Sequence, residues 1–378
     1  MDYEDFGRGI LEINLGVLAQ NIKVAKSLVS ADVSIMAAVK ANAYGHGILS
    51  FAHGAVAAGV DWLGVATVDE GAILRKGKIS HPVLVMGALF AGDFQKLAGL
   101  DLSVTVFGFE VAQRLSESGG GRVHIKVDTG MNRIGFQVND DNAAEAACRE
   151  ILRISKLPNI YIEGIFSHFA SSDTDPGFTD VQFRRFNNLV RRLEDAGLNI
   201  PIKHISNSGG VLNHPECNLN MVRLGVLLYG LAPDSTTQGA EKLAKMGILP
   251  ILALKSRIVH IKIIVAMESV GYNRNFYAGK PTKIATIPLG YGDGVSRQLS
   301  NRGFVQIHGK LCPIVGNVCM DQFMVDATGL DIAVGDEVTL IGEGVSAEQV
   351  AQWQGSINYE VVTALSGRIQ RNYKYTQF

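Results

Sequence analysis

The sequence is poor in cysteine and has no excess of charge of either sign. Its four cysteines, Cys148, Cys217, Cys312 and Cys319, show neither CxxC spacing nor the density of a disulfide scaffold, so we expect reduced thiols and no metal site. The formal net charge of −1, without a long basic run, gives no electrostatic reason for nucleic acid or an anionic membrane to be the main partner. A small molecule is the default partner.

Long apolar segments are also missing. The N-terminal segment MDYEDFGRGILEINLG has no basic start followed by an apolar core, and no later segment reaches about eighteen uninterrupted apolar residues. We therefore expect a soluble, cytoplasmic protein. The sequence does have ample material for packed cores, since 47% of its 378 residues are hydrophobic, and its length suits one large α/β domain with a smaller companion.

Strand-like and helix-like segments alternate from about residue 34 onward. The strand-like runs are residues 34–40, 62–67, 82–87, 102–108, 122–128, 161–169, 201–206 and 221–230. Between them, segments such as 46–59 and 181–197 have apolar spacing near 3.6 and end in glycine, which suits helices outside a parallel sheet. Eight such units predict a TIM-type (β/α)8 barrel, with a doubly wound open sheet as the alternative.

The pattern changes near residue 240. The strand-like segments 251–264, 282–290, 304–316 and 336–342 follow one another across turns, which predicts a second, mostly β domain. We expect the barrel domain to span residues 1–240 and the β domain residues 241–378. The early strand ILEINLG precedes the barrel pattern, so it is free to pair with the C-terminal domain.

The segment AAVKANAYGHG ends a buried strand with Lys40, and its glycines suit a turn into a helix. One interpretation is a lysine that extends to solvent at a strand end. The other is a desolvated amine held for covalent chemistry with a carbonyl compound.

Further polar residues follow the other predicted strands at their C-terminal ends, where barrels keep their active sites. Together with the lysine they are Lys40, Tyr44, Lys126, Asp128, Arg133, His168, Ser208 and Arg223. Each alone has a structural explanation, such as a core histidine or an ion-pair arginine. Their convergence on one opening is harder to explain without a shared function.

The loops after the seventh and eighth strands contain Ser208, Gly225 and Val226, at the place where barrels commonly bind phosphate. The glycines could instead serve only tight turns. A phosphate site opposite a strand-end lysine suggests pyridoxal 5′-phosphate, with Lys40 forming its Schiff base. Arg223, unlike an acidic residue, cannot hold a proton on the pyridine nitrogen, and this favours racemisation over transamination.

Motifs along nearly the whole chain resemble the bacterial alanine racemase family. They are AVKANAYGHG, KVDTGMNRIGF, SHFASSD, HISNSGG, NMVRLGVLLYGLAP, GYNRNF, IPLGYGDG, PIVGNVCMDQ and INYE, in the expected order. The resemblance implies a pyridoxal-phosphate-dependent isomerase with a barrel and a β domain, acting on alanine as a homodimer whose sites are shared between chains. It also implies a role in making D-alanine for cell-wall peptidoglycan or in alanine catabolism.

The resemblance assigns roles to individual residues. Lys40 and Tyr272 would be the two catalytic bases. Cofactor contacts would come from Lys40, Tyr44, Arg133, His168, Ser208, Arg223, Gly225, Val226 and Tyr359. Arg133 and Met320 would bind the substrate, and Tyr291 would sit in the entrance. Lys126 matches a lysine that is carbamylated in some relatives, and a plain ion pair with Asp128 is the alternative.

Two segments depart from the family pattern. SVGYNRNF stands where relatives usually have Ser-Tyr-Gly, and GYGDG replaces Gly-Tyr-Ala-Asp-Gly. Both lie near the expected entrance, so they concern substrate range more than reaction type. The alternatives are a racemase of another small amino acid such as serine, a fold-related decarboxylase, which usually has a glutamate in place of Arg223, and a non-catalytic cofactor carrier, which would lack the β domain.

Overall fold

The computed structural model describes residues 7–376. Contacts divide them into two units, described separately below. The barrel unit comprises residues 22–43 and 48–228, and the β unit comprises residues up to 21, residues 44–47 and residues from 229 onward.

The barrel unit is built on parallel strands that close on themselves. Their order is β5-β4-β3-β2-β10-β9-β8-β6, β5 pairs with β6, and the short β7 (Phe136–Gln137) extends β6. The strands are β2 (Ser34–Ala38), β3 (Trp62–Val65), β4 (Val83–Val85), β5 (Ser103–Val106), β6 (Gly121–Asp128), β8 (Ile160–Phe166), β9 (Ile202–His204) and β10 (Met221–Leu224). Six of them fall within strand-like runs of the sequence, and β6 and β8 begin one residue before theirs, so the predicted closed barrel is confirmed and the open sheet is wrong.

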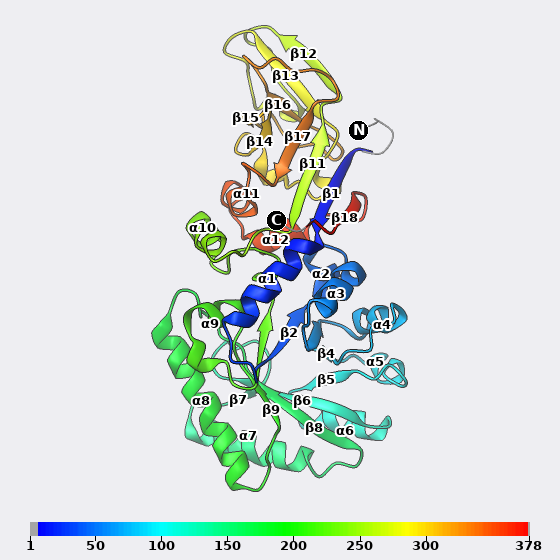
Figure 1. The fold of residues 1–378 in the computed structure, drawn as a ribbon, viewed down its shortest axis with the longest axis vertical. Coiled ribbons are helices and arrows are strands. Elements are labelled where there is room, and N and C mark those ends of the chain that lie inside the picture. The colour runs from blue at the N-terminus through cyan, green and yellow to red at the C-terminus, as the bar shows by residue number, and fades with distance from the viewer. Residues whose placement is uncertain (1–6, 377–378) are drawn as a thin grey trace. The chain divides into compact units, whose positions relative to one another are not determined.

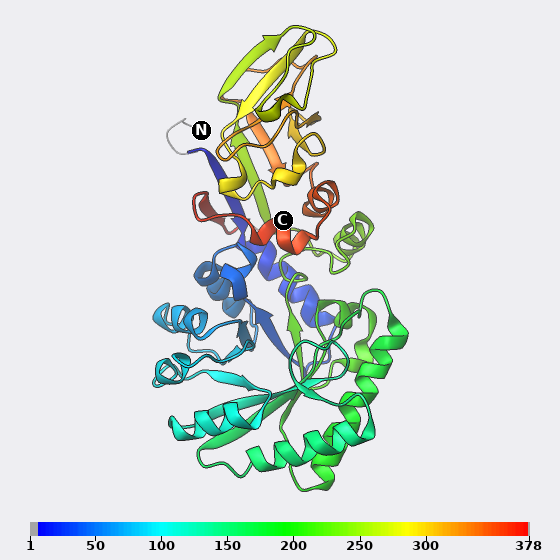
Figure 2. The same cartoon turned by 180° about the vertical axis from the view of Figure 1, so that it is seen from behind.

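Helices lie outside these strands (Figures 1 and 2). They are α3 (Ile48–Ala57), α4 (Val68–Lys76), α5 (Asp93–Lys96), α6 (Phe109–Glu117), α7 (Asp141–Ile154), α8 (Pro176–Asp195) and the short α9 (Ser208–Asn213), which the 3-10 turn η2 (Pro215–Cys217) follows. Helix α8 begins where Asp175 accepts a bond from the Phe178 N–H and Pro176 fixes the first turn. Buried residues on α7 recur three and four positions apart, which turns one face to the strands.

The β unit contains two sheets. The larger has the order β15-β14-β17-β11-β1-β18 and the smaller β12-β13-β16. Their strands are β1 (Gly9–Asn14), β11 (Leu252–Arg257), β12 (His260–Ile264), β13 (Thr282–Ile287), β14 (Phe304–Ile307), β15 (Lys310–Pro313), β16 (Phe323–Asp326), β17 (Glu337–Ile341) and β18 (Gln370–Lys374). The early strand is β1, which pairs antiparallel with β11 and parallel with β18.

Helices also occur in the β unit, although the sequence pattern did not predict them. They are α10 (Thr237–Lys245), α11 (Ala347–Gln354) and α12 (Asn358–Thr363), with 3-10 turns η3 (Tyr272–Arg274), η4 (Tyr291–Asp293) and η5 (Arg297–Leu299). Helix α1 (Leu15–Ser27) connects β1 to the barrel unit along the chain. Over residues 7–376, none of the helices has both the length and the apolar character needed to cross a bilayer.

Candidate active site

Lys40 opens the expected turn into a helix, but the turn is left-handed. In α2 (Lys40–Tyr44) the four residues after the lysine have φ between 49° and 54°, and the right-handed helix α3 begins only at Ile48. Residues with a Cβ atom pay about 1–2 kcal/mol each in this conformation. Four in succession need specific support from their surroundings.

Glu70 supplies that support. Its Oε1 accepts a hydrogen bond from the Ala41 N–H at 2.6 Å, and its Oε2 accepts one from the Ala66 N–H at 2.8 Å. At the other end of the turn, Asn42 Oδ1 accepts a bond from the Ile48 N–H at 2.9 Å. One carboxylate thus ties the turn to the end of β3, and Lys40 is held at the C-terminal edge of the barrel.

The environment of the Lys40 amine favours the neutral, nucleophilic form. Burial lowers its pKa, the positive charges of Arg133 and Arg223 lower it further, and Glu70 opposes them. Its amine forms no hydrogen bond or ion pair with the residues between 7 and 376. A lysine with a lowered pKa and no competing partner suits covalent chemistry with an aldehyde.

Arg223, on β10, is nearly fully buried. Its Nη2 donates to Ser167 O at 2.7 Å, to Ile205 O at 3.0 Å and to His168 Nδ1 at 2.9 Å, while Nη1 donates to His204 Nδ1 at 3.0 Å. Burial, with a contribution from the Arg133 charge, lowers the pKa of Arg223 to about 9, so the guanidinium stays charged at neutral pH.

Two features of this arrangement bear on ligand binding. The Nε–H of Arg223 has no partner within the described part of the chain, so one donor remains available. Burial and the Arg223 charge lower the pKa of His168 well below its usual value, so its ring is neutral. Because Nδ1 of His168 accepts from Arg223, the ring proton is on Nε2, where it can be donated to another group.

Lys126 and Asp128 do not form the ion pair considered as the alternative for this lysine. Lys126 Nζ donates to Val127 O at 2.6 Å, whereas Asp128 Oδ1 accepts from the backbone of Gly130 and Asn132, and no ion pair joins the two within residues 7–376. Asp128 instead shapes the loop that carries Arg133. Burial lowers the pKa of Lys126 to about 7, and the Arg223 charge contributes.

The loops after β9 and β10 meet at Ser208. Its Oγ accepts a bond from the Gly225 N–H at 3.1 Å, which leaves the hydroxyl proton free to be donated to a ligand. Val226, the next residue, is buried. Within the barrel unit, therefore, the structure brings the expected Ser208, Gly225 and Val226 together.

In the β unit, two expected phosphate contacts lie near each other. The rings of Tyr44 and Tyr359 are 6.4 Å apart, and the fully buried Tyr229 lies 4.9 Å from Tyr44. The Tyr359 hydroxyl donates to Pro233 O at 3.4 Å. Burial raises the pKa of Tyr44 to about 12, so its hydroxyl is a hydrogen-bond donor and not a base at neutral pH.

The remaining expected residues lie on exposed loops of the β unit. Tyr272 on η3 is 70% exposed, and its carbonyl accepts a bond from Asn317 Nδ2 at 2.8 Å. The Tyr291 N–H donates a hydrogen bond to Cys319 O at 3.0 Å, and Cys319 is the residue before Met320. The loops of Tyr291 and Met320 are therefore joined. Both side chains are exposed.

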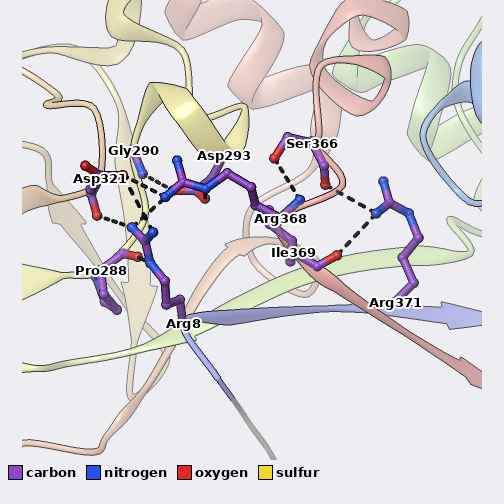
Figure 3. Close-up of polar contacts among 9 residues, drawn as sticks. All are labelled: Arg8, Pro288, Gly290, Asp293, Asp321, Ser366, Arg368, Ile369 and Arg371. Atoms are coloured by element: carbon purple, nitrogen blue, oxygen red, sulfur yellow. Dashed lines mark hydrogen bonds and ion pairs between the residues drawn. The ribbon is translucent and has the colours of Figure 1, made fainter.

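Asp293 fixes these two loops through a cluster of charges, shown in Figure 3. This carboxylate is 1% exposed, accepts a bond from the Gly290 N–H at 2.9 Å, and lies 3.4 Å from both Arg8 and Arg368. Arg368 in turn donates to Asp321 at 2.7 Å. We call these four charged residues, Arg8, Asp293, Asp321 and Arg368, the Asp293 cluster.

Several residues of the site were not identified from the sequence. Glu70, Tyr229, His204 and Asp293 contact expected residues or their loops. Glu70 lies in α4, outside the motifs quoted above, whereas the other three lie inside those motifs, which gave no sign of their contacts. Polar residues within otherwise apolar strands, such as His204, were the available signal.

Pyridoxal 5′-phosphate fits the residues of the barrel unit. Four cationic side chains, those of Lys40, Lys126, Arg133 and Arg223, influence one another there and suit an anionic ligand. The amine of Lys40 and the Nε–H of Arg223 both lack partners among residues 7–376, as an aldehyde-binding lysine and a ring-nitrogen donor require.

Comparisons with known proteins identify the family to which the chain belongs. Family models described as the N-terminal and C-terminal domains of alanine racemase match residues 13–233 and 251–373. The chain is 39% identical over 373 residues to the alanine racemase of Methanococcus maripaludis, covering 96% of this chain and 97% of that protein. An alanine racemase structure from Clostridium difficile matches with a TM-score of 0.90 and 37% identity, over 98% of this chain and 96% of the other. One from Bartonella henselae, described with covalently bound pyridoxal phosphate, matches with a TM-score of 0.85 and 26% identity, over 97% and 99%.

Proposed function

Because the chain belongs to the alanine racemase family, we propose that it interconverts L-alanine and D-alanine with pyridoxal 5′-phosphate as cofactor. The observation that carries the proposal is the pair formed by Lys40, a desolvated amine without a partner, and Arg223, a buried guanidinium with a free N–H. The Bartonella henselae relative, with its covalently bound pyridoxal phosphate, supports the choice of cofactor.

When bound, pyridoxal phosphate draws electrons from Cα of an attached amino acid and so makes the Cα proton acidic. Inversion requires removal of that proton on one face and its return on the other, so two acid/base groups must flank the reacting carbon. We assign one face to the Lys40 amine and the other to the Tyr272 hydroxyl. His168, neutral and carrying its proton on Nε2, would hydrogen bond to Tyr272 or support Arg223.

Arg223 determines where the proton returns. A guanidinium can donate a hydrogen bond to a ring nitrogen but keeps its own proton at neutral pH, because even its lowered pKa is about 9. A carboxylic acid at this position would transfer a proton to the ring and strengthen electron withdrawal. Arg223 thus favours return of the proton to Cα, which supports a racemase over a transaminase or a decarboxylase.

The remaining expected residues have binding roles in this proposal. The phosphate contacts would be Tyr44, Ser208, Gly225, Val226 and Tyr359. Arg133 would lie beside the cofactor and the substrate carboxylate, Met320 would bind the carboxylate, and Tyr291 would line the entrance. Lys126, with a pKa of about 7, has the neutral amine that reaction with carbon dioxide to a carbamate requires.

We also propose that the enzyme is a homodimer in which the β domain, residues 241–378, completes the partner's site in the barrel domain, residues 1–240. An exposed apolar stripe on and after the edge strand β12 supports this. Ile263, Val265 and Met267 occupy alternate positions and are 69%, 61% and 76% exposed, close in sequence to the exposed Tyr272. The enzyme would work in the cytoplasm and supply D-alanine to peptidoglycan or serve alanine catabolism.

The test is a comparison of Cα exchange with inversion. Purified enzyme with added pyridoxal phosphate is incubated with L-alanine, D-alanine or L-serine in D2O; NMR follows loss of the Cα proton, and chiral chromatography follows inversion. We expect alanine to exchange and invert in both directions, faster than serine, and Lys40→Ala to do neither. Release of carbon dioxide, or preferential inversion of serine, would instead support one of the alternatives.

A further inference from the structure

A chain of hydrogen bonds leads away from Arg223 through the interior of the barrel. Arg223 Nη1 lies 3.0 Å from His204 Nδ1, His204 Nε2 lies 2.9 Å from His124 Nδ1, and His124 Nε2 lies 3.3 Å from Glu163 Oε2. The four residues come from strands β10, β9, β6 and β8, which are neighbours in the order β10-β9-β8-β6. Both histidines are fully buried.

The direction of every bond in this chain is determined. Arginine has only donors, so His204 Nδ1 must accept. Burial first, and then the Arg223 charge, lowers the pKa of His204 well below its usual value, so the neutral ring carries its proton on Nε2 and donates it to His124. Burial likewise lowers the pKa of His124, which therefore donates from Nε2 to Glu163.

Glu163 ends the chain as an acceptor. Burial raises the pKa of its carboxyl group, but hydrogen bonds from His124 and Ser103 outweigh this effect and lower it overall, so the group is ionised. The Ser103 hydroxyl donates at 2.5 Å, and Arg122 Nε lies 3.6 Å away. A chain with a donor-only end and an acceptor-only end has one arrangement in which all its bonds form.

The surroundings keep both rings in place. A Cβ atom on Gly164 would lie 2.3 Å from His124 Nδ1, the atom that accepts from His204, so only glycine leaves room for this bond. Phe166 stacks on His204 at 4.8 Å with 12° between the rings, and Trp62 contacts His124 edge-on at 5.5 Å. These aromatic neighbours offer no competing acceptor.

Arg223 also lacks a direct counter-charge, since no carboxylate lies within 4.0 Å of it across residues 7–376. We propose that Glu163, acting through His124 and His204, is a positioning residue that holds the Arg223 guanidinium in its orientation and balances its buried charge. The functional part of this inference rests on the proposed role of Arg223 in racemisation. The relay itself is a property of the barrel unit alone.

The test uses Glu163→Leu, which removes the acceptor, Glu163→Gln, which keeps an acceptor without the charge, and Glu145→Gln, which removes an exposed carboxylate on α7 as the control. Holoenzyme labelled with 15N-histidine reports which ring nitrogens carry protons. In the parent and in the control we expect His124 and His204 to be neutral, with the proton on Nε2.

For Glu163→Leu we expect altered 15N shifts at both histidines and kcat for alanine lowered about 10- to 100-fold, as for other residues that orient a site through a second residue. KM should stay within about threefold. Glu163→Gln, which preserves side-chain shape, should keep the proton positions and lose about three- to tenfold in kcat.

Parental kcat in both Glu163 variants would overturn the proposal, as would a lowered kcat with unchanged histidine shifts, because the effect would then not pass through the relay. If Glu163→Leu does not fold, Glu163→Gln alone tests the proposal by the same two measurements, kcat and the 15N shifts of the histidines. The proposed function and the relay can fail separately. If the parent enzyme does not racemise alanine, the proposed function is wrong, but the histidine protons should still lie on Nε2 as the relay predicts.

Discussion

Removal of the Glu70 carboxylate tests how the left-handed turn after Lys40 is maintained. Glu70 accepts the N–H groups of Ala41 and Ala66. In Glu70→Gln an amide NH2 group replaces one of the two carboxylate oxygens and faces a backbone N–H, so one of the two hydrogen bonds is lost. The loss of a hydrogen bond to a charged group costs about 1.5–3 kcal/mol. The turn also stores strain of about 1–2 kcal/mol per residue, so transient local opening should become more frequent while the closed form stays the major one.

Hydrogen exchange measured by mass spectrometry checks this directly. Peptides covering residues 39–48 should exchange roughly 10- to 150-fold faster in Glu70→Gln than in the parent, and faster still in Glu70→Ala, which loses both bonds. Asp69→Asn, in the same turn of α4, is the control, because the one ion pair of Asp69 among residues 7–376 is with the exposed Lys96. Parental exchange in Glu70→Gln would refute the view that the carboxylate holds the turn.

The same substitution should shift the titration of Lys40. Burial, Arg133 and Arg223 lower the pKa of this amine, and Glu70 opposes them, so removing the Glu70 charge should lower the pKa further. The amine then loses its proton at a lower pH. In cofactor-free protein, the pH midpoint for labelling of Lys40 by an amine-reactive reagent should therefore fall in Glu70→Gln and stay parental in Asp69→Asn; a rise would contradict the stated role.

Three further predictions concern other parts of the site. Carbamylation of Lys126 should increase as pH rises through its pKa of about 7, because only the neutral amine reacts with carbon dioxide, and mass spectrometry of protein equilibrated with bicarbonate at pH 6 and pH 8 measures it; equal modification at both values would contradict the lowered pKa. Co-refolding of inactive Lys40→Ala and Tyr272→Phe chains in equal amounts should restore about a quarter of the parental active sites if each site uses both chains, because about half the dimers are hybrids with one intact site. No recovery, with hybrids verified by different tags, would reject shared sites. Asp293→Asn should raise KM for alanine several-fold and leave kcat within about twofold, because the loops beside the Asp293 cluster carry Tyr291 and Met320, the proposed entrance and substrate contacts; an unchanged KM would show that the cluster serves folding alone.

The barrel could be predicted from the sequence because its strands are short apolar runs buried on both faces, separated by helices with a 3.6-residue period. Lys40 and Arg223 were predicted as site residues for the same reason, since Lys40 is a charged residue at the end of such a run and Arg223 is one inside such a run. The strand order and the closure between β5 and β6 follow from that regular alternation.

The left-handed turn could not be predicted. Ala41 and Ala43 have no preference for positive φ, and the turn depends on Glu70, which lies 29 residues later than Ala41. The path from Arg223 to Glu163 was equally hidden, because it joins residues from four strands through atoms that only the folded barrel brings together. Helix α11 was missed although Ser346 and Gln349 form a capping box, a signal that the strand-rich surroundings obscured.

The pairing of β1 constrains how the protein is made in the cell. Ile10 pairs with Gln370, so β1 completes its sheet only after the residues from 11 to 370 have been synthesised. At typical rates of translation this interval is on the order of tens of seconds, during which the edge of β1 that pairs with β18 stays uncovered. Most strands of the barrel, in contrast, pair with strands that lie close to them in the sequence, and the pairing of β2 with β10 is the exception. During synthesis β1 thus needs cover from the ribosome, a chaperone or the nascent barrel, a need that is not visible in the folded structure.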